Sequence, residues 1–566
     1  MERLKLLTYF IILILSACNA FTSEQESPDI LLNKVDALFA NMDNKESPGA
    51  AVLIVKDGKV ILNKGYGMAN LEYKIPITPT TVFDIASVSK QFTGFAISLL
   101  IEQGKISLED DIRQYIPELA DFGHTITIGH LIHHTSGLRD WPGTLSLAGL
   151  RMDDVISFSQ ILTMAFNQKE LNFIPGAEYS YSNTGYNLLA ELVQRVTGES
   201  FREWTDINIF QPLGMTDTHF HDDHTEIVTN KAYGYFHGGD NMFHATPNNL
   251  TALGSSSLYT TIDDLAKWVM NLDNSKVGGK SVIDRMLQQG MLNNGEQISY
   301  AFGLSIDDYQ GIKRISHSGG WASFSTYLAY FPEYNFSVVV LNNFPTNPYE
   351  AAHDIADIYL ADKLEPQNKE NNQDEQVAET VNVPIQVLDE YIGTYRLGPA
   401  WYVTISRDGD QLMTCATAED IFPMTATSAS TFWIEAYGSS IQFNRDESGQ
   451  VSNFYYRGMT CPKLKGISKL ISEQLAEFTG EYMSEELKTS YTVAPEGDQL
   501  VLKHDHHGTI SLIHAWNDDF RGGIWFMNSV EFYRDKEGKV NGFLVTNNRS
   551  RNQRFVKIKS DKQIFE

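Results

Sequence analysis

Apolar positions near the start of the chain change from helical to strand spacing. Residues 29–42 carry apolar side chains at helical spacing, which predicts a helix. Two short apolar runs, Ala51–Val55 and Val60–Leu62, flank Asp57-Gly58, and this dipeptide between apolar runs is a strong signal for a β-hairpin. Helical and strand patterns then alternate irregularly to about residue 345. The first part of the chain is therefore expected to mix helices and strands.

Two later apolar runs indicate the middle of a sheet. Tyr327–Phe331 ends at Pro332, and Phe336–Leu341 follows it. Both runs are interpreted as central strands of an antiparallel sheet. A last helix of this region is expected over about Pro348–Lys363.

A polar segment separates this region from an internal repeat. Glu365–Thr380 has almost no large apolar residues and many Gln, Asn and Glu, which predicts a linker. Beyond it, Leu388–Tyr395 matches Leu475–Tyr482 at an offset of 87 residues. Phe443–Val451 and Phe532–Val540 match at an offset of 89 residues. Two matches at nearly one spacing indicate a repeated unit.

Each copy of the repeat has the composition of a small β-domain. Tyr, Phe, Trp, Thr and Val are frequent and glycine-containing turns interrupt them, which suggests many short antiparallel strands. Closing such strands into a barrel removes exposed strand edges. The repeat therefore predicts two small antiparallel β-barrels.

Length and charge limit the possible partners. The chain has 566 residues, of which 42% are hydrophobic, and this is enough for several packed cores. At about 100–200 residues per domain, roughly three or four units are expected. The net charge of −27 repels phosphate backbones, so no nucleic-acid partner is expected. The acidic residues are spread along the chain, which favours a role in solubility.

The first 20 residues differ in kind from the rest. Arg3 and Lys5 precede an apolar run, Leu6–Leu15, that is too short to span a bilayer comfortably, which indicates a signal peptide. Cys18 follows two small residues, and this resembles the lipobox of bacterial lipoproteins. The resemblance implies cleavage before Cys18, a lipid anchor as the sole membrane contact, and a place in the bacterial cell envelope, periplasmic or at the outer membrane. An ordinary signal peptide cleaved nearby is the alternative.

Cysteines and histidine clusters add little to this picture. Cys415 and Cys461 could pair in an oxidising envelope, and the sequence leaves this open. Residues 219–224 and 504–507 contain several histidines and acidic residues, which are metal-ligand types. Neither cluster has a recognisable ligand spacing, so both are interpreted as solvated loops and no metal or other cofactor is expected.

The first of three chemical motifs is Ser87-x-x-Lys90, at the start of a predicted helix that ends near Gly104. Residues three apart share one helix face, and the helix dipole favours negative charge near a serine in the first turn. A nearby ammonium lowers the cost of forming the alkoxide, and a neutral amine can take its proton. The pattern alone is weak, because it occurs by chance in a chain of this length.

The other two motifs are Tyr181-x-Asn183, ahead of a helix, and His317-Ser-Gly319-Gly320, beside the predicted strand pair. A Tyr hydroxyl next to a Lys ammonium can have a lowered pKa and act as a general base. A glycine-rich strand edge lets substrate approach closely and offers N–H groups to an oxyanion. Taken singly, Tyr181 is more simply a core aromatic residue, and His317 an ordinary strand histidine.

Together, the three motifs occur in the order and roughly at the spacing of one superfamily. The sequence resembles the serine β-lactamase and penicillin-binding protein superfamily, with its class C β-lactamases, D,D-peptidases, D-aminopeptidases and related esterases. The likeness extends over about residues 30–360. It includes Leu131–Leu138, similar to the family's structural turn beside the site, and Pro212–Met215, also similar to a family segment.

The resemblance implies a role for each motif residue. Ser87 would be acylated, and Lys90 and Tyr181 would share proton transfer to and from its Oγ. The backbone N–H groups of Ser87 and Gly320 would hold the oxyanion, at the strand edge that includes Gly319. Asn183 would bind a substrate amide, and His317 would face the scissile bond.

The resemblance also implies an α+β fold. Its β-lactamase-like catalytic domain has an antiparallel sheet flanked by helices, together with a helical subdomain, and the two small antiparallel β-barrel domains follow. The expected segments are a signal peptide over residues 1–18, a catalytic domain over 27–364, a linker over 365–383, a first barrel over 384–465 and a second over 470–566.

The third motif favours one branch of the superfamily. His317 stands where many β-lactamases of this type have lysine, and histidine there is similar to certain D,D-peptidases and D-aminopeptidases. The catalytic domain with two barrels also resembles the D-aminopeptidases. We therefore expect a serine peptidase or amidase whose partner is a small-molecule or short-peptide substrate. A carboxylesterase or β-lactamase of the same superfamily is one alternative, and an inactive binding lipoprotein is another; the oligomeric state is left open.

Overall fold

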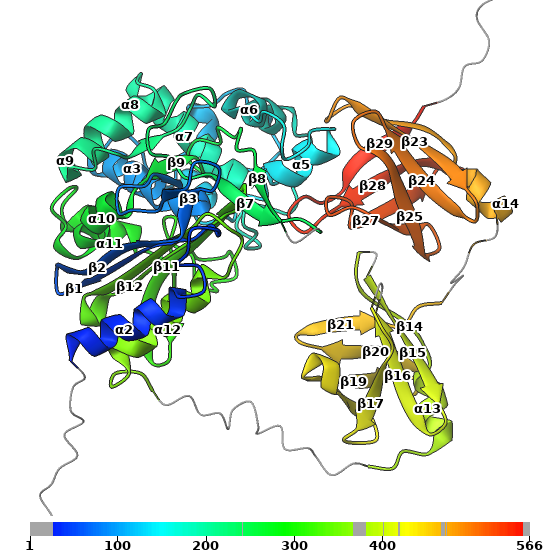
Figure 1. Ribbon diagram of the computed structural model, residues 1–566. Helices are drawn as coiled ribbons and strands as arrows, with labels where there is room; N and C mark the ends of the chain where they lie inside the picture. Colours follow the sequence, from blue (N-terminus) through cyan, green and yellow to red (C-terminus); the bar gives the residue numbers. More distant parts are fainter. Residues whose placement is uncertain are drawn as a thin grey trace, which may run out of the picture.

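The computed structural model describes residues 27–239, 242–365, 381–399, 401–416, 419–465, 470 and 472–558. These form a mixed unit of helices and strands followed by two all-β units (Figure 1). Cys18 and residues 366–380 of the expected linker lie outside the described residues. No helix in the described part of the chain is both long and apolar enough to cross a membrane.

An antiparallel sheet forms the centre of the mixed unit, in the strand order β10-β11-β12-β13-β1-β2. The β1–β2 hairpin turns at Asp57 and Gly58, whose φ angles of 50° and 69° confirm the predicted two-residue turn. The predicted central position of β12 and β13 is also confirmed. The strands are β1 (Ala50–Lys56), β2 (Lys59–Tyr66), β10 (Ser305–Tyr309), β11 (Ile312–Trp321), β12 (Phe324–Phe331) and β13 (Phe336–Asn342).

Helices cover both faces of this sheet (Figure 1). On one face lie α2 (Pro28–Phe39) and α12 (Pro348–Leu360), which correspond to the predicted first and last helices and end slightly earlier. On the other lie α3 (Lys90–Glu102), α10 (Ile262–Asn274) and the helical subdomain. Val52 of β1 belongs to the core under α2 and α12, and its neighbour Leu53 to the core under α3. Because successive strand residues point to opposite faces and both faces are covered, β1 is apolar from Ala50 to Val55.

The helical subdomain and three small sheets complete this unit. Its further helices are α4 (Ile128–Ile132), α5 (Trp141–Leu147), α6 (Phe158–Asn167), α7 (Asn183–Thr197), α8 (Phe201–Thr205), α9 (Gln211–Leu213) and α11 (Lys280–Met286). The short strands are β3 (Met68–Asn70), β4 (Ile75–Pro76), β5 (Phe83–Asp84), β6 (His219–Phe220), β7 (Gly234–His237), β8 (Phe243–Thr246) and β9 (Leu258–Thr260).

The repeated region forms two eight-stranded antiparallel units, as predicted. In the first, barrel 1, β14–β21 follow in sequence order, and a bridge between Tyr395 and Lys463 joins the two ends of the sheet. The second, barrel 2, closes fully. Barrel 1 contains β14 (Gly393–Gly398), β15 (Trp401–Asp408), β16 (Gln411–Ala416), β17 (Phe422–Ala426), β18 (Thr431–Ile434), β19 (Ser439–Arg445), β20 (Val451–Tyr456) and β21 (Met459–Pro462). Barrel 2 contains β22 (Gly480–Ser484), β23 (Thr489–Glu496), β24 (Gln499–His504), β25 (Gly508–Trp516), β26 (Asp519–Gly522), β27 (Ser529–Arg534), β28 (Val540–Thr546) and β29 (Gln553–Lys557).

The same hydrogen bond recurs at matching positions of the two barrels. The buried Tyr395 hydroxyl donates to the Tyr391 carbonyl at 2.8 Å, and the buried Tyr482 hydroxyl donates to the Phe478 carbonyl at 2.6 Å. In each barrel this bond fixes the short segment that enters the first strand. The sequence repeat is therefore a structural repeat. Cys415 and Cys461, in barrel 1, are both free.

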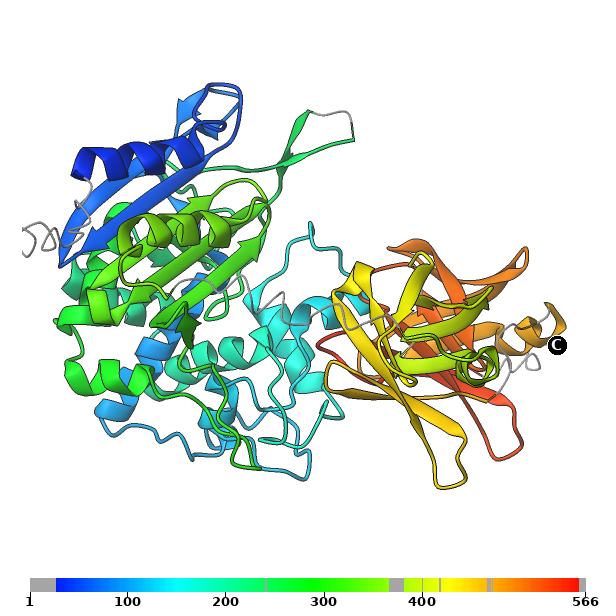
Figure 2. The ribbon, with the colours of Figure 1, turned by 90° about the horizontal axis from the view of Figure 1, so that it is seen from below.

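Barrel 2 packs directly on helix α5 of the mixed unit (Figures 1 and 2). Leu147, at the end of α5, is fully buried within the apolar core of barrel 2. His507 Nε2 lies 2.7 Å from the Ser146 carbonyl, and His506 Nδ1 lies 3.1 Å from that of Gly149. Residues 505–507 form a turn in which Asp505 and His506 are exposed, as predicted, but the histidines of this turn also contact the mixed unit. His507 and His506 thus contact carbonyl groups at the end of α5 and just beyond it.

Barrel 1 contacts barrel 2 at one buried carboxylate. The Tyr402 hydroxyl donates to Asp519, and Arg396 Nη2 lies 3.7 Å from the same side chain. Burial raises the pKa of Asp519, and these two donors oppose the rise. Barrel 2 is thus held between barrel 1 and α5.

Leu147→Ala should loosen the docking of barrel 2. Deleting a fully buried leucine side chain typically costs about 2–5 kcal/mol, so the unfolding transition that includes barrel 2 should move to lower temperature. Differential scanning calorimetry measures this shift. The matched control is Leu38→Ala, because Leu38 on α2 is 37% exposed and its loss should change little. Equal transition temperatures for the two variants would contradict the docking described here.

Candidate active site

Ser87 lies in a short turn, η1 (Ala86–Ser89), that leads from β5 into α3. The turn is strained at Ala86, whose φ of 47° is uncommon for a residue other than glycine. Asp84 stabilises it, since one carboxylate oxygen accepts the Ala86 N–H at 2.8 Å and the other accepts from Asn248 at 2.9 Å. Burial raises the pKa of Asp84 to about 6. Asp84 thus holds the backbone that presents Ser87, a role that no sequence motif indicated.

Lys90 is buried directly behind Ser87. Its Nζ lies 3.1 Å from Ser87 Oγ and 2.7 Å from both Asn183 Oδ1 and the Ser255 carbonyl. The amide and carbonyl oxygens can only accept, so they take two N–H groups of the amine. Burial lowers the pKa of Lys90 well below its ordinary value, although the Asp140 carboxylate opposes this. A neutral amine so placed keeps a lone pair for the Ser87 proton and can act as the general base.

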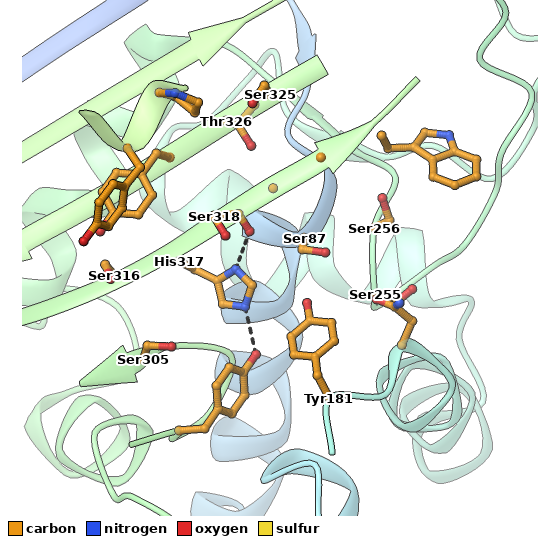
Figure 3. A pocket seen from close by; sticks show the side chains of 18 of the residues that line it. Ser87, Tyr181, Ser255, Ser256, Ser305, Ser316, His317, Ser318, Ser325 and Thr326 are labelled. Carbon is orange, nitrogen blue, oxygen red and sulfur yellow. Dashed lines mark hydrogen bonds between the residues drawn. The ribbon is translucent and has the colours of Figure 1, made fainter. Parts of the chain in front are cut away.

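Tyr181 faces Ser87 from the opposite wall, and Figure 3 shows its hydroxyl directed toward Ser87. Lys90 Nζ lies 4.8 Å from the centre of the Tyr181 ring. Burial raises the pKa of Tyr181, and its hydrogen bond with Ser87 offsets only part of this rise. The expectation that the Tyr181 pKa is lowered is therefore wrong. At neutral pH Tyr181 is a phenol, which can pass a proton onward.

His134, within the predicted structural turn, positions Tyr181. Its φ of 58° and its nearly complete burial fix the ring in the loop before α5. His134 Nδ1 accepts the Ser182 N–H at 3.1 Å, and its ring centre lies 4.3 Å from that of Tyr181. The chain between Tyr181 and α7 is thus held by a side chain from a separate turn.

The glycine pair lies on the part of β11 nearest to Ser87. Strand β10 pairs with β11 between two end pairs, Tyr309 with Ile312 and Ser305 with Ser316. The residues of β11 that follow Ser316 line the cavity. A Cβ atom at Gly319 would lie 2.4 Å from the Ile85 carbonyl oxygen and 3.0 Å from Ser87 N. Such contacts are too short, so the close approach of strand and turn requires glycine there. The Ser87 and Gly320 N–H groups remain the predicted oxyanion donors.

His317 is held as an uncharged imidazole (Figure 3). Its Nδ1 lies 2.6 Å from the Ser318 carbonyl, which can only accept, and its Nε2 lies 2.9 Å from the Tyr300 hydroxyl. Nδ1 therefore carries the proton, and Nε2 accepts from Tyr300. Burial, with a contribution from Lys90, lowers the pKa of His317 to about 3. The third motif thus presents no cation at neutral pH.

A charged pair that no motif indicated borders the same cavity. Asp140, 3% exposed at the start of α5, accepts the Asn183 N–H at 2.7 Å and the Asn183 side-chain amide at 3.1 Å. Arg549, from the β28–β29 loop of barrel 2, donates to Asp140 at 3.3 Å. Its guanidinium lies 4.8 Å from the centre of the Tyr181 ring. Asp140 and Arg549 are 409 residues apart in the sequence, so no local pattern could connect them.

The β28–β29 loop is anchored on both sides of Arg549. Asn172 donates to the Arg549 carbonyl at 2.9 Å and accepts the Arg551 N–H at 2.8 Å. The fully buried guanidinium of Arg139 donates to the Arg551 carbonyl at 3.0 Å and pairs with Glu486 of barrel 2. The loop therefore belongs to the wall of the site.

All the predicted residues of the catalytic unit lie at one cavity of about 1010 Å³. Lys90 lies behind its wall and contacts Ser87 and Asn183. The roles assigned to Asn183, His317 and the two glycines toward substrate stay predictions. The other predicted residues line the cavity together with Arg549: Ser87, Tyr181, Asn183, His317, Gly319 and Gly320.

Comparisons with known proteins agree with this arrangement. A family profile described as Beta-lactamase matches residues 35–362. Protein flp of Staphylococcus aureus (strain MRSA252) is 32% identical over 304 residues, which make up 52% of this chain and 59% of that protein. A D-aminopeptidase of Gluconobacter oxydans (strain 621H) is 30% identical over 324 residues, 56% of this chain and 60% of that protein. The chain thus spans about 60% of the length of these two curated relatives.

A solved structure extends the likeness beyond the mixed unit. It is the octameric penicillin-binding protein homologue from Pyrococcus abyssi, which aligns with a TM-score of 0.55 and 21% identity. The alignment covers 84% of this chain and 98% of that one. At this identity the likeness shows a shared fold.

Lys90→Arg should stop acylation of Ser87, because a guanidinium keeps its charge and cannot take the serine proton. The rate of covalent labelling by a fluorophosphonate should fall by roughly 10²–10⁴, the usual contribution of a general base. In the wild type, the labelling rate should decline as pH falls through the lowered Lys90 pKa, because the amine then becomes protonated. The control is Lys105→Arg, at an exposed lysine just beyond α3. Wild-type labelling of Lys90→Arg, or a wild-type rate that rises toward acid pH, would contradict this role.

Proposed function

Because the chain belongs to the beta-lactamase family of serine hydrolases, we propose that it cleaves peptide or amide bonds of small substrates through an acyl-enzyme on Ser87. One observation carries the proposal: Ser87 Oγ lies 3.1 Å from a buried amine whose other two partners can only accept hydrogen bonds. Burial lowers the pKa of this amine well below its ordinary value, which supports its action as a base. The alternative of an inactive binding protein is disfavoured for the same reason.

The side chains supply each proton transfer of the reaction. Ser87 Oγ forms a bond to the substrate carbonyl carbon while its proton passes to Lys90 Nζ. The N–H groups of Ser87 and Gly320 would stabilise the resulting oxyanion. As the C–N bond breaks, Tyr181 gives its proton to the leaving nitrogen and regains one from Lys90. A water molecule then attacks the ester carbon with the same groups acting in reverse, which releases the acid and restores Ser87.

The charges around the cavity support an uncharged substrate. Among the described residues that line it, the guanidinium groups are those of Arg314 and Arg549. Arg314 binds Asp307 at 2.8 Å, and Arg549 binds Asp140. With His317 neutral, a substrate carboxylate would meet no unpaired cation from these groups. Neutral amides therefore fit better than carboxylate-bearing β-lactams.

The shape of the site supports a small substrate. The Arg549 loop of barrel 2 occupies one side of the cavity, and the Trp141 and Trp321 rings, 5.7 Å apart, form an apolar wall. This wall suits a single apolar side chain next to the scissile bond. The relative from Gluconobacter oxydans is named a D-aminopeptidase, which supports substrates with D-residues. A carboxylesterase or β-lactamase activity remains the alternative within the family.

We also propose a location in the bacterial cell envelope, with a lipid anchor on Cys18. The motif of small residues before Cys18, after a short apolar run, supports this location. Detergent-phase partitioning of the wild type and of Cys18→Ser tests it: the substitution should abolish partitioning, and partitioning that persists would count against the anchor.

Kinetics on three substrate classes test the proposed reaction. At pH about 7.5, kcat/KM for a D-amino acid amide should exceed that for a chromogenic cephalosporin, because His317 is neutral there. A simple ester serves as the third substrate. Ser87→Ala should abolish turnover and labelling, whereas Ser159→Ala, at an exposed serine of α6, should leave both unchanged. Cephalosporin turnover equal to or above that of the amide would reassign the protein to the β-lactamases, and an ester preferred over the amide would reassign it to the esterases.

A further inference from the structure

Two histidines and a glutamate meet beside the small sheet that leads to the nucleophile. His219 lies on β6, His221 follows this strand, and Glu226 lies in the next loop. Glu226 Oε2 is 3.5 Å from His221 Nδ1 and 4.0 Å from His219 Nε2. Three ligand atoms, one from each residue, lie within 4.8 Å of one another. The three side chains thus converge on one point.

The two histidine nitrogens that face this point are buried and without a hydrogen-bond partner among the described residues. The His221 side chain is only 2% exposed, so water does not readily replace a partner. Leaving a buried acceptor unpaired costs about 1–3 kcal/mol, and native structures rarely do so. Two such atoms aimed at one carboxylate oxygen indicate a missing ligand between them.

The surroundings of the three ligands are prepared for a cation. Arg202 donates to Glu226 Oε2 at 2.6 Å and to Oε1 at 2.9 Å, and hydrogen bonds of this kind orient metal-ligating carboxylates. The His219 ring lies 5.9 Å from Tyr259 in a stacked arrangement, and the His221 ring 4.4 Å from it. The packing against Tyr259 fixes both ring planes.

The charges near His219 also favour a cation. Glu226, Asp206 and Asp222 act on His219 as negative charges and outnumber the one positive charge there, Arg202. At His221, Glu226 is opposed by Arg202 and Lys231.

From this geometry we propose that His219, His221 and Glu226 bind one divalent transition-metal ion, for which Zn²⁺ is the best fit. Two imidazoles and one carboxylate are common zinc ligands, at about 2.0–2.2 Å from the ion in a tetrahedral site. The observed separations need only small inward movements of the side chains to reach such distances. Ca²⁺ and Mg²⁺ prefer oxygen ligands alone. Glu226, 33% exposed, leaves the site open to solvent on one side, where a water molecule can complete the coordination.

The site joins the elements that support Ser87. His219 pairs with Tyr259 of β9, and Tyr259 pairs with Asp84 of β5. Asn248 donates to the Tyr259 hydroxyl at 3.1 Å and also to Asp84. A metal ion would therefore stiffen the third strand of the sheet that holds the Asp84 turn. Its role is structural, and it does not depend on the proposed reaction. The interpretation of residues 219–224 as a solvated loop is wrong for His221, which is buried.

Isothermal titration of the full-length protein with ZnCl₂, after removal of bound metal by a chelator, tests the proposal. The wild type should show saturable binding that includes this site. His221→Gln should weaken binding at the site by at least about 10-fold to 100-fold, since even outer partners of metal ligands contribute on that scale. The control is His224→Gln, an exposed histidine of the same loop, which should bind as the wild type does. Zn²⁺ should also raise the unfolding temperature of the wild type and of the control, but not that of His221→Gln.

Glu226→Gln provides a second variant if His221→Gln does not fold, because the side chain is partly exposed and the amide has nearly the same shape. It should likewise lose affinity for Zn²⁺ and the thermal shift. Fluorophosphonate labelling of Ser87 reports separately on the catalytic site. A failure of labelling would count against the proposed reaction and would leave the measurement of zinc binding unaffected. Absence of saturable binding by the wild type, or wild-type binding by both variants, would overturn the proposal. In the second case the ion would bind elsewhere, for example at the histidines that contact α5.

Discussion

The active site depends on the buried carboxylate of Asp140. A carboxylate removed from water is stable only when donors surround it. Asn183 provides two of these donors, and Arg549 of barrel 2 provides another. Asn183 in turn uses its side-chain oxygen to bind Lys90, the proposed base beside Ser87. A continuous set of contacts therefore runs from barrel 2 to Ser87, the proposed nucleophile, and the docked barrel 2 supplies part of the cavity wall.

Asp140 and Arg549 together also set the charge on Lys90, the proposed base. Asp140 favours the protonated form of Lys90, whereas Arg549 and burial favour the neutral amine. Without Arg549, the carboxylate would act on Lys90 with less opposition and would raise the pKa of the amine. Barrel 2 thus places a charge 4.8 Å from the Tyr181 ring and fills one side of the cavity with its loop. The burial of Leu147 in the core of barrel 2 holds this loop in place.

Local patterns in the sequence predicted much of the fold and the nearest catalytic residues. The β1–β2 hairpin follows from Asp57-Gly58, and Ser87 and Lys90 share a turn because they are three residues apart. Features that depend on burial could not be predicted in this way. The pKa of Tyr181 is raised rather than lowered, because packing around the ring outweighs the nearby charges. Arg549 approaches Asp140 only through the docking of a separate domain, and the burial of His221 depends in part on its packing against the distant Tyr259.

The most direct measurement is a double-mutant cycle on Asp140 and Arg549, with the rate of Ser87 acylation as the readout. Asp140→Asn and Arg549→Gln should each slow acylation, and the double variant should lose far less than the product of the two effects. The expected coupling is about 0.5–3 kcal/mol, as for residues in direct contact within one network. Circular dichroism of each variant controls for folding. If Arg549→Gln acylates at the wild-type rate, or if the two effects are simply additive, barrel 2 is not part of the catalytic unit.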